Sequence, residues 1–257
     1  MKVVVCAKLI PDPAAPQALD GKNNLDRSGK LVLDDADTYG IEVALQLVES
    51  TREGEVVVVS MASSDDLTGL RSALAMGATR GIVVSDESLR GTDSLGTAKI
   101  LASVVRSVGP DLILCATESS DGYTGMVPIQ LAELLGVPSL TNAKTVVVEE
   151  SKVKINRQTS SGYQEVVASL PCVVTVTAGA VEPRYASFKG IMASKSKPVE
   201  VLSVEELGLA SEIGMGGARQ EVFATVVSES RKAGQKFLDE GDGAERIVAF
   251  LESLNIL

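Results

Sequence analysis

The sequence predicts an α/β fold with a doubly wound, mostly parallel sheet, an added antiparallel portion and a C-terminal helical arm. In the N-terminal half, short apolar runs rich in β-branched residues alternate with amphipathic segments of helical length. Such near-continuous hydrophobic strands are typical of a parallel sheet that helices cover on both faces. After Gly136-Val137-Pro138 the pattern changes to strands joined by short turns, which is typical of antiparallel pairing.

The first half supplies the elements of the parallel sheet. Strands are expected at residues 3–6, 56–60, 81–84 and 112–115. Helices are expected around residues 41–48, 67–74 and 98–105, with candidate N-caps at Asp37, Ser63 and Ser94. Right-handed crossovers then give a doubly wound sheet. The segment between Pro11 and Asp34 has no such pattern, and irregular segments of this length are often functional or ordered by a partner.

The second half supplies the antiparallel portion and the arm. Strands are expected at residues 144–150, 153–157, 164–168 and 172–177, with a hairpin turn at Ser160-Ser161-Gly162. Residues 208–217 are typical of a linker. A last helix at 245–254 carries Ile247, Phe250, Leu251 and Leu254 on one side. This stripe must pack either on its own domain or on another chain.

Composition excludes several classes of function. The 257 residues carry a net charge of −10, which argues against nucleic acid or anionic lipid as a partner. The absence of histidine excludes a Ser-His-Asp triad, a Cys-His dyad and a histidine-ligated metal. No carboxylate spacing specifies a metal site or acid/base catalysis, and we expect neither.

Cysteine usage and hydropathy indicate a cytoplasmic protein without a membrane span. Cys6, Cys115 and Cys172 each lie in an apolar run and form no C-x-x-C motif, so we expect reduced, buried strand residues. No apolar run reaches the 18 residues of a membrane-spanning helix. Met1 is followed at once by a strand-like run rather than by the pattern of a secretory signal.

One loop, at residues 114–136, has the properties of an anion site. It follows a buried strand at its carboxyl end, where ligands bind in open α/β sheets. Pro128 is tolerated only in the first turn of a helix, so the helix should start near Gly125 and leave its first N–H groups unpaired. Ser119 and Ser120 add hydroxyl donors. A phosphate site and an ordinary capped polar loop both remain open, while Walker-A and strand-linked G-x-G-x-x-G motifs are absent.

A second segment, from Glu182 to Glu200, combines apolar and basic side chains. Its charges sum to +2 in an acidic chain, and Phe188, Ile191 and Met192 lie among small residues. An apolar group in such a loop is either an anchor for a partner or part of a loop folded back on its own core.

Several spaced motifs resemble the β subunits of electron transfer flavoproteins. They are V-x-I-x-R at 153–157, Gly162, LPCVVTV at 170–176, EPRY at 182–185, Ile191-Met192 and Lys195. VVVCAKLIPD at 3–12, SALAMGA at 72–78 and SSDGYTG at 119–125 support them. The resemblance extends from Lys2 to about Leu207, with a similar C-terminal tail.

The resemblance implies a heterodimer in which an α subunit holds the redox-active FAD and this chain, with an adenine nucleotide α-hydrolase-like fold, binds a structural AMP. The AMP positions of the family fall on Cys6, Thr38, Tyr39, Gly40, Ile41, Met61, Ala116, Thr117, Ser119, Ser120, Asp121, Gly122, Tyr123 and Thr124. The family's loop for docking dehydrogenases falls on residues 184–195, with Arg184, Tyr185, Phe188, Lys189, Ile191, Met192 and Lys195. Phe188 stands where the family has an anchoring leucine.

The implied function is electron carriage without bond chemistry. Acyl-CoA or other flavin dehydrogenases would donate electrons, as in fatty acid β-oxidation, and a quinone oxidoreductase would accept them. Residues 1–207 would form the nucleotide-binding domain, and residues 208–257 a linker and an arm that contacts the α subunit. Two alternatives remain: an electron-bifurcating form with a second FAD in this subunit, and a stand-alone adenine-nucleotide enzyme. The second lacks the SGG-x-DS and HIGH motifs.

Overall fold

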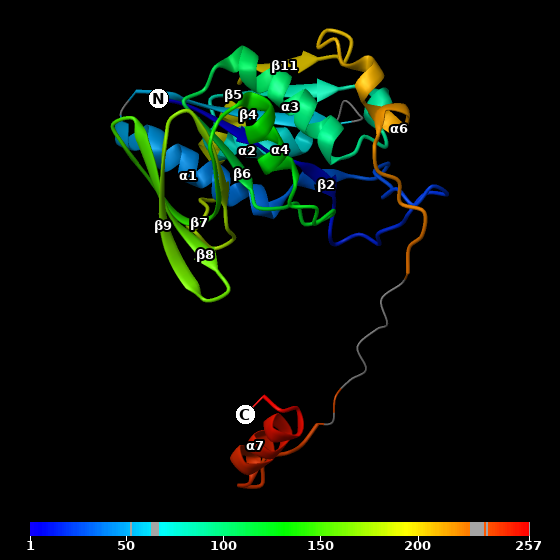
Figure 1. The fold of residues 1–257 in the computed structure, drawn as a ribbon, viewed down its shortest axis with the longest axis vertical. Helices are drawn as coiled ribbons and strands as arrows, with labels where there is room; N and C mark the ends of the chain where they lie inside the picture. Colours follow the sequence, from blue (N-terminus) through cyan, green and yellow to red (C-terminus); the bar gives the residue numbers. More distant parts are fainter. Residues whose placement is uncertain (52, 63–66, 227–233, 235, 257) are drawn as a thin grey trace. The chain divides into compact units, whose positions relative to one another are not determined.

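A mostly parallel sheet organises the first of two compact units in the computed structural model, which describes residues 1–51, 53–62, 67–226, 234 and 236–256 (Figure 1). The units are Met1–Phe223 and Ala224–Leu257. The described strands are β1 Lys2–Cys6, β2 Leu9–Pro11, β3 Leu31–Leu33, β4 Glu55–Ala62, β5 Arg80–Ser85, β6 Leu112–Ala116, β7 Ser139–Glu149, β8 Lys152–Thr159, β9 Gly162–Ser169, β10 Cys172–Val176 and β11 Val199–Leu202. The described helices are α1 Asp35–Thr51, α2 Thr68–Met76, α3 Ser94–Val108, α4 Val127–Leu135, α5 Phe188–Ser194, α6 Gly214–Gly217 and α7 Gly243–Ser253, with 3₁₀ turns η1 Glu87–Leu89 and η2 Ala210–Glu212.

The strand order of the sheet confirms the doubly wound fold class. Within the described residues the order is β11-β5-β4-β1-β6-β10-β7-β8-β9, and pairing is parallel from β11 to β7. β4 and β5 extend the sheet to one side of β1, and β6 lies on the other side. The winding direction therefore reverses at β1, and a crevice is expected at the carboxyl ends of β1 and β6.

The strands are apolar throughout because both faces of the sheet are covered. Val3 and Val5 pack in one core cluster with α1 and α2, whereas Val4 and Cys6 pack in a second cluster with α3 and α4. Val3, Val4 and Val5 are all fully buried. Alternate residues of one strand thus face two different helical layers, which removes the polar positions that a one-sided sheet would have.

The antiparallel portion is confirmed, with one difference in the order of strands. β7, β8 and β9 form an antiparallel meander, and the turn between Thr159 and Gly162 lies where the hairpin was predicted. β10 does not continue this meander: it inserts between β6 and β7 and is parallel to both. Its five residues are all buried, as an internal strand requires.

Helix starts differ from the predicted ones by one to three residues. Asp93, not Ser94, caps α3 by accepting a hydrogen bond from the Gly96 amide at 2.8 Å. α1 begins at Asp35 rather than Asp37, and α4 begins at Val127 rather than near Gly125. At α3, a carboxylate one residue earlier satisfies the same free amides, so spacing alone does not select between the two caps. The predicted cap at Ser63 lies outside the described residues.

Two short segments contain structure that the sequence pattern did not predict. β2 and β3 pair in an antiparallel ladder that closes the irregular segment 12–30 at its base. The segment 208–217, interpreted as a linker, packs on the first unit instead. Ile213 is buried there, and the Gly214 amide donates to Thr92 Oγ1 at 2.8 Å.

The second unit contains α7, whose predicted apolar stripe stays exposed within that unit. Ile247 and Phe250 are each 61% exposed and Leu254 is 50% exposed. Arg246 pairs with Asp242 at 2.6 Å and lies 5.1 Å from the centre of the Phe237 ring. Among the described residues, no helix is both long and apolar enough to cross a bilayer.

Candidate functional site

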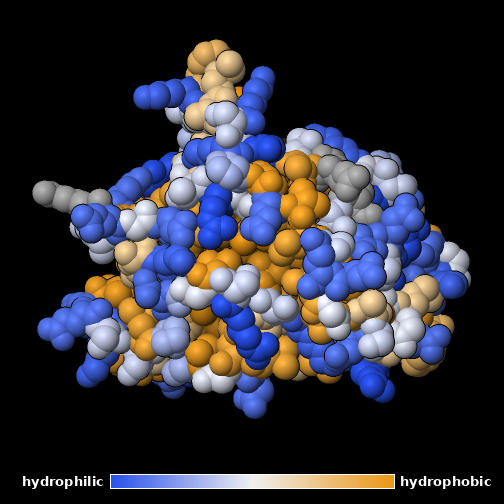
Figure 2. Space-filling model, turned by 90° about the horizontal axis from the view of Figure 1, so that it is seen from above, coloured by the Kyte–Doolittle hydropathy of each residue, from blue (hydrophilic) through white to orange (hydrophobic). Residues whose placement is uncertain are grey.

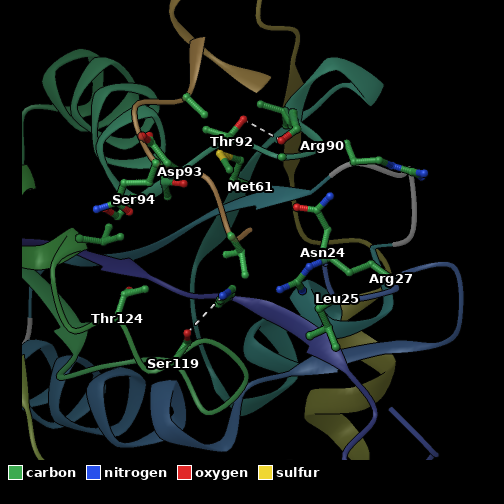
Figure 3. A pocket seen from close by; sticks show the side chains of 18 of the residues that line it. Asn24, Leu25, Arg27, Met61, Arg90, Thr92, Asp93, Ser94, Ser119 and Thr124 are labelled. Atoms are coloured by element: carbon green, nitrogen blue, oxygen red, sulfur yellow. Dashed lines mark hydrogen bonds between the residues drawn. The ribbon is translucent and has the colours of Figure 1, made fainter. Parts of the chain in front are cut away.

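A cavity of about 1600 Å³ opens at the carboxyl ends of β1, β4 and β6, where the winding of the sheet reverses (Figure 3). Cys6, Met61 and Ala116 line it from these three strand ends. Side chains from separate segments surround it: residues 20–27 of the irregular segment, residues 89–94 after β5, the loop after β6, and residues 215–223. In Figure 3, Arg27, Asp93 and Ser119 come from three of these sides.

Two thiols form part of the cavity lining. Cys6 and Cys115 are direct partners in the parallel ladder of β1 and β6, and both are buried. The hydrogen bond with the Cys6 thiol, together with burial, holds the pKa of Cys115 well above its usual value. The Cys115 thiolate is the nucleophilic form and is disfavoured here, so this thiol contributes packing rather than chemistry.

A buried carboxyl group, Asp37, also lines the cavity. It accepts a hydrogen bond from the Lys8 amide at 2.6 Å and is only 5% exposed. Burial raises its pKa to about 8, and the neighbouring Asp34 adds to this effect. Asp37 therefore carries a proton near neutral pH, when its carboxyl group can both accept and donate a hydrogen bond.

Two buried carboxylates, Asp34 and Asp121, hold the loop after β6 in place. Asp34, which is fully buried, accepts hydrogen bonds from the Ser120 amide at 2.8 Å and the Ser120 hydroxyl at 2.9 Å. Lys8 Nζ lies 2.6 Å from Asp121 Oδ1 and 3.1 Å from Ser119 Oγ, and Arg27 also pairs with Asp121. Burial raises the pKa of Asp121, but these two cations outweigh it and hold the pKa below its usual value.

The same loop places donors of an anion site next to the cavity. Thr124 and Gly125 line it immediately before α4, whose first amides lack partners within the helix. Gly125 has a φ of +60°, a conformation that most side chains disfavour, and its missing Cβ leaves the backbone accessible to a ligand. Lys8 and Arg27 add positive charge. Apolar Met61, Leu89, Leu101 and Val127 supply a surface for a flat base. These residues fit an adenine nucleotide.

The structure brings only part of the expected nucleotide set to the cavity. Cys6, Met61, Ala116, Ser119 and Thr124 line it directly. Ser120 and Asp121 lie behind the lining and hold the loop in place. The remaining positions outside the lining are Thr38, Tyr39, Gly40, Ile41, Thr117, Gly122 and Tyr123.

Side chains of these outer positions have other surroundings. Ile41 is fully buried against the sheet, and a Cβ at Gly40 would lie 3.6 Å from Val5 Cγ1. Thr117 Oγ1 donates to the Val176 carbonyl at 3.4 Å. Tyr123 has a φ of +49° and a side chain that is 67% exposed.

Sequence reasoning missed several residues of the cavity. Lys8 follows the end of β1, and Asp37 lies in the first turn of α1. Both positions lie at the edge of the sheet where a ligand is expected, so the sequence pattern could have identified these two residues. Arg27 lies in the irregular segment 12–30, and Met215 lies in the presumed linker. Periodicity gives no information on either segment, and their approach to the cavity depends on tertiary structure.

The expected docking segment contains a short helix rather than only a loop. Ser187 caps α5 by accepting from the Gly190 amide at 3.0 Å. Tyr185 and Phe188 are 94% and 81% exposed, and Ile191 and Met192 are about half exposed. Lys189 and Lys195 are exposed beside them. The apolar side chains of the segment are thus exposed, although α5 itself lies against α2. Figure 2 shows one face of the molecule on which hydrophobic residues gather near the middle, with hydrophilic residues around them.

Comparison with known proteins agrees with this architecture. A family model described as "Electron transfer flavoprotein domain" matches residues 23–207. The chain is 36% identical to electron transfer flavoprotein subunit beta of Mycobacterium leprae, with 99% of each chain covered. It is 30% identical to the caffeyl-CoA reductase-Etf complex subunit CarD of Acetobacterium woodii, with 91% of each covered. It is 29% identical to electron transfer flavoprotein subunit beta of Megasphaera elsdenii over 96% of this chain and 95% of that protein. The chain therefore belongs to the electron transfer flavoprotein family and groups with its β subunits.

Proposed function

We propose that this chain is the β subunit of a heterodimeric electron transfer flavoprotein and that it acts as a carrier subunit, not as an enzyme. One observation carries the proposal: the cavity offers groups that bind, but its acidic and thiol groups that we described are buried, protonated or paired. A cavity of this kind is suited to binding a nucleotide without catalysing a reaction on it. The electron carriage itself rests on the family relationship.

FAD held with the α subunit supplies the redox chemistry, and this chain supplies binding, orientation and a wall around the flavin. Electron transfer needs proximity and suitable potentials, so the absence of histidine is no handicap. The apolar stripe of α7, with Ile247, Phe250 and Leu254, is exposed within its own unit. We assign it to the contact with the α subunit, which accounts for that exposure.

The cavity holds a structural AMP in this proposal. The phosphate lies near the first amides of α4, the Thr124 hydroxyl and the cations Lys8 and Arg27. The base packs near Met61, at the end of β4. Asp34 and Asp121 keep the loop in position and do not need to touch the ligand.

Residues 184–195 dock the electron-donating dehydrogenases, with Phe188 as the anchor. A few exposed apolar side chains with a few charges form a small interface, which suits a carrier that must release each partner. Acyl-CoA or other flavin dehydrogenases are the donors, and a quinone-linked oxidoreductase is the acceptor. Free thiols at Cys6, Cys115 and Cys172 fit a reducing compartment such as the cytoplasm.

Coexpression with the α subunit tests this function. We expect a stable complex of the two chains that is yellow from bound flavin and that accepts electrons from an acyl-CoA dehydrogenase. If the chain instead purifies as a colourless monomer that hydrolyses ATP, the proposal is wrong and the stand-alone enzyme is correct.

One observation favours a second candidate, the bifurcating form with a second FAD in this subunit. The cavity of about 1600 Å³ exceeds the roughly 300–1,000 Å³ of most small-molecule pockets. The number of flavins per complex separates the two: one FAD supports the AMP form, and two FAD support the bifurcating form.

A further inference from the structure

The start of the docking segment is attached to α1 through one arginine, Arg184. Arg184 Nε donates to Glu42 Oε2 at 2.7 Å and Nη2 donates to Glu42 Oε1 at 3.0 Å. The same guanidinium donates to both carboxylate oxygens of Glu49, at 2.6 and 3.1 Å. Glu42 and Glu49 lie two turns apart on α1, so Arg184 bridges two carboxylates with paired hydrogen bonds to each.

The carboxylate of Glu42 depends on this arginine. Its side chain is only 4% exposed, and a buried charge is costly unless it is paired and hydrogen-bonded. Burial raises the pKa of Glu42, but hydrogen bonds from Arg184 and Gln46 outweigh that effect and lower it. Hydrogen bonds to Glu49 and Glu42 likewise raise the pKa of Arg184 above its usual value. The positive charge of Arg184 is therefore already neutralised within the chain.

The far end of the segment is fixed to α2. Arg71 Nη1 donates to the carbonyls of Ser194 and Lys197 at 2.6 and 2.8 Å. Lys197 Nζ donates to the carbonyls of Leu74 and Ala78 at 2.9 and 2.6 Å, near the C-terminus of α2.

The middle of α5 also touches α2 closely. A Cβ at Gly190 would lie 2.4 Å from the Ala75 carbonyl oxygen, so only glycine fits there. α5 thus has fixed contacts on α2 at its middle and its end. Before α5, the contact with α1 is made by Arg184.

We propose that Arg184 is a positioning residue that sets the orientation of the docking helix by clamping the start of the segment to Glu42 and Glu49. It acts through Tyr185 and Phe188, the exposed residues that follow it, and it does not contact the dehydrogenase. This inference rests on the proposed docking function and changes the role of one residue in it, since Arg184 was expected among the docking contacts.

The test uses the complete complex with its α subunit and compares Arg184→Met with the double variant Glu42→Gln/Glu49→Gln. The first readout is hydrogen exchange of the amides of residues 188–194, which is measured without a dehydrogenase. We expect both variants to exchange about tenfold faster there, because the segment opens more easily without the clamp. The triple variant, which combines all three substitutions, should exchange these amides no faster than either of the other two variants. Each variant removes the same ion pairs of the Arg184 guanidinium.

The second readout is electron uptake from an acyl-CoA dehydrogenase. We expect KM for the dehydrogenase to rise about tenfold in both variants, with kcat and flavin content unchanged. Arg184→Lys should lie between wild type and Arg184→Met, because an ammonium group cannot bridge two carboxylates as the planar guanidinium does. Lys2→Met, which removes a 3.5 Å pair with Glu55 at another place in the sheet, is the control and should change neither readout.

Direct contact with the partner gives the opposite pattern. If Arg184→Met raises KM while Glu42→Gln/Glu49→Gln leaves KM unchanged or lowers it, Arg184 touches the dehydrogenase and the clamp is refuted. Unchanged exchange at residues 188–194 also refutes it. Phe188→Ala distinguishes failure of the docking function from failure of the clamp. If Phe188→Ala has a normal KM, the docking function itself is wrong. If Phe188→Ala has a raised KM and Arg184→Met has a normal KM, only the clamp is refuted.

Discussion

The loop at the cavity and the docking segment are attached to the same helix in two different ways. Both are irregular segments that lie far along the chain from α1. The cavity loop is held by the carboxylate of Asp34, just before α1, which accepts from an amide and a hydroxyl of Ser120. The docking segment is held by Glu42 and Glu49, further along α1, through the charged Arg184.

The difference follows from what each segment presents. The cavity loop presents polar groups inward, and the fully buried carboxylate of Asp34 supports it through hydrogen bonds from uncharged donors, beside the ion pairs of Asp121 with Lys8 and Arg27. The docking segment presents apolar groups outward, and its support is an ion-pair cluster in which Glu42 is buried, Arg184 is half-buried and Glu49 is exposed. Changes near the start of α1 should therefore affect stability and nucleotide binding, and changes further along should affect partner binding.

The largest loss of stability is expected for Asp34→Ala. It removes three hydrogen-bond acceptances by a fully buried carboxylate and leaves the Ser120 and Ala36 amides without this acceptor. We expect the free energy of unfolding to fall by about 2–3 kcal/mol, measured by urea denaturation of the complex. Asp35→Ala, which changes the exposed neighbour, is the control and should cost less than about 0.5 kcal/mol. Equal losses would mean that Asp34 does not support the loop.

Gly190→Ala should have the next largest effect. The new methyl group would lie 2.4 Å from the Ala75 carbonyl oxygen and would push α5 away from α2. We expect a loss of about 1–2 kcal/mol together with a raised KM for the dehydrogenase. Gly29→Ala, whose Cβ would have no neighbour within 4 Å, is the matched control. A normal KM in Gly190→Ala would show that docking tolerates a displaced α5.

Asp37→Asn should change the pH dependence of stability. The pKa of Asp37 is raised to about 8 in the folded chain from 3.8, so between these values the folded state holds a proton that the unfolded chain has lost. This group therefore lowers stability as pH rises, by at most about 1.4 kcal/mol per pH unit. Asparagine does not titrate, so the variant should gain stability relative to wild type from pH 5 to pH 7.5. Parallel pH curves for the two proteins would contradict a raised pKa.

The smallest effect on stability is expected for Phe188→Ala. This side chain is 81% exposed, so the free energy of unfolding should change by less than about 0.5 kcal/mol. Electron uptake from the dehydrogenase should nevertheless slow. Tyr163→Ala, on exposed β9, is a control for the loss of an exposed aromatic group. Loss of flavin in Phe188→Ala would show instead that the segment supports the fold.

Sequence patterns predicted the parallel half well because burial on both faces leaves an unbroken apolar run. β1, β4, β5 and β6 each contain the expected strand. The insertion of β10 beside β6 was not predicted, since a parallel pairing with a strand far along the chain leaves no local turn signal. α5 was missed because its seven residues are too few to show a helical period.

The candidate site, like the fold, could be predicted from the sequence only in part. The loop after β6 could be predicted from a buried strand followed by Pro128 in a helical context. The residues that hold this loop and the docking segment could not be predicted, because Asp34 and Ser120 are 86 residues apart and Arg184 and Glu42 are 142 apart. Local rules identify where a ligand binds, whereas the residues that hold the site in place are decided by tertiary contacts.

The most direct test of the account is the content of the cavity in the purified complex with the α subunit. Nucleotides released by denaturation and quantified by mass spectrometry should comprise one AMP and one FAD per complex. Asp121→Ala combined with Thr124→Ala should lower the AMP below one per complex and leave the FAD unchanged, because the first change frees the loop and the second removes a donor. A complex that contains no adenine nucleotide besides one FAD, or an AMP content that the double variant does not change, would contradict the account.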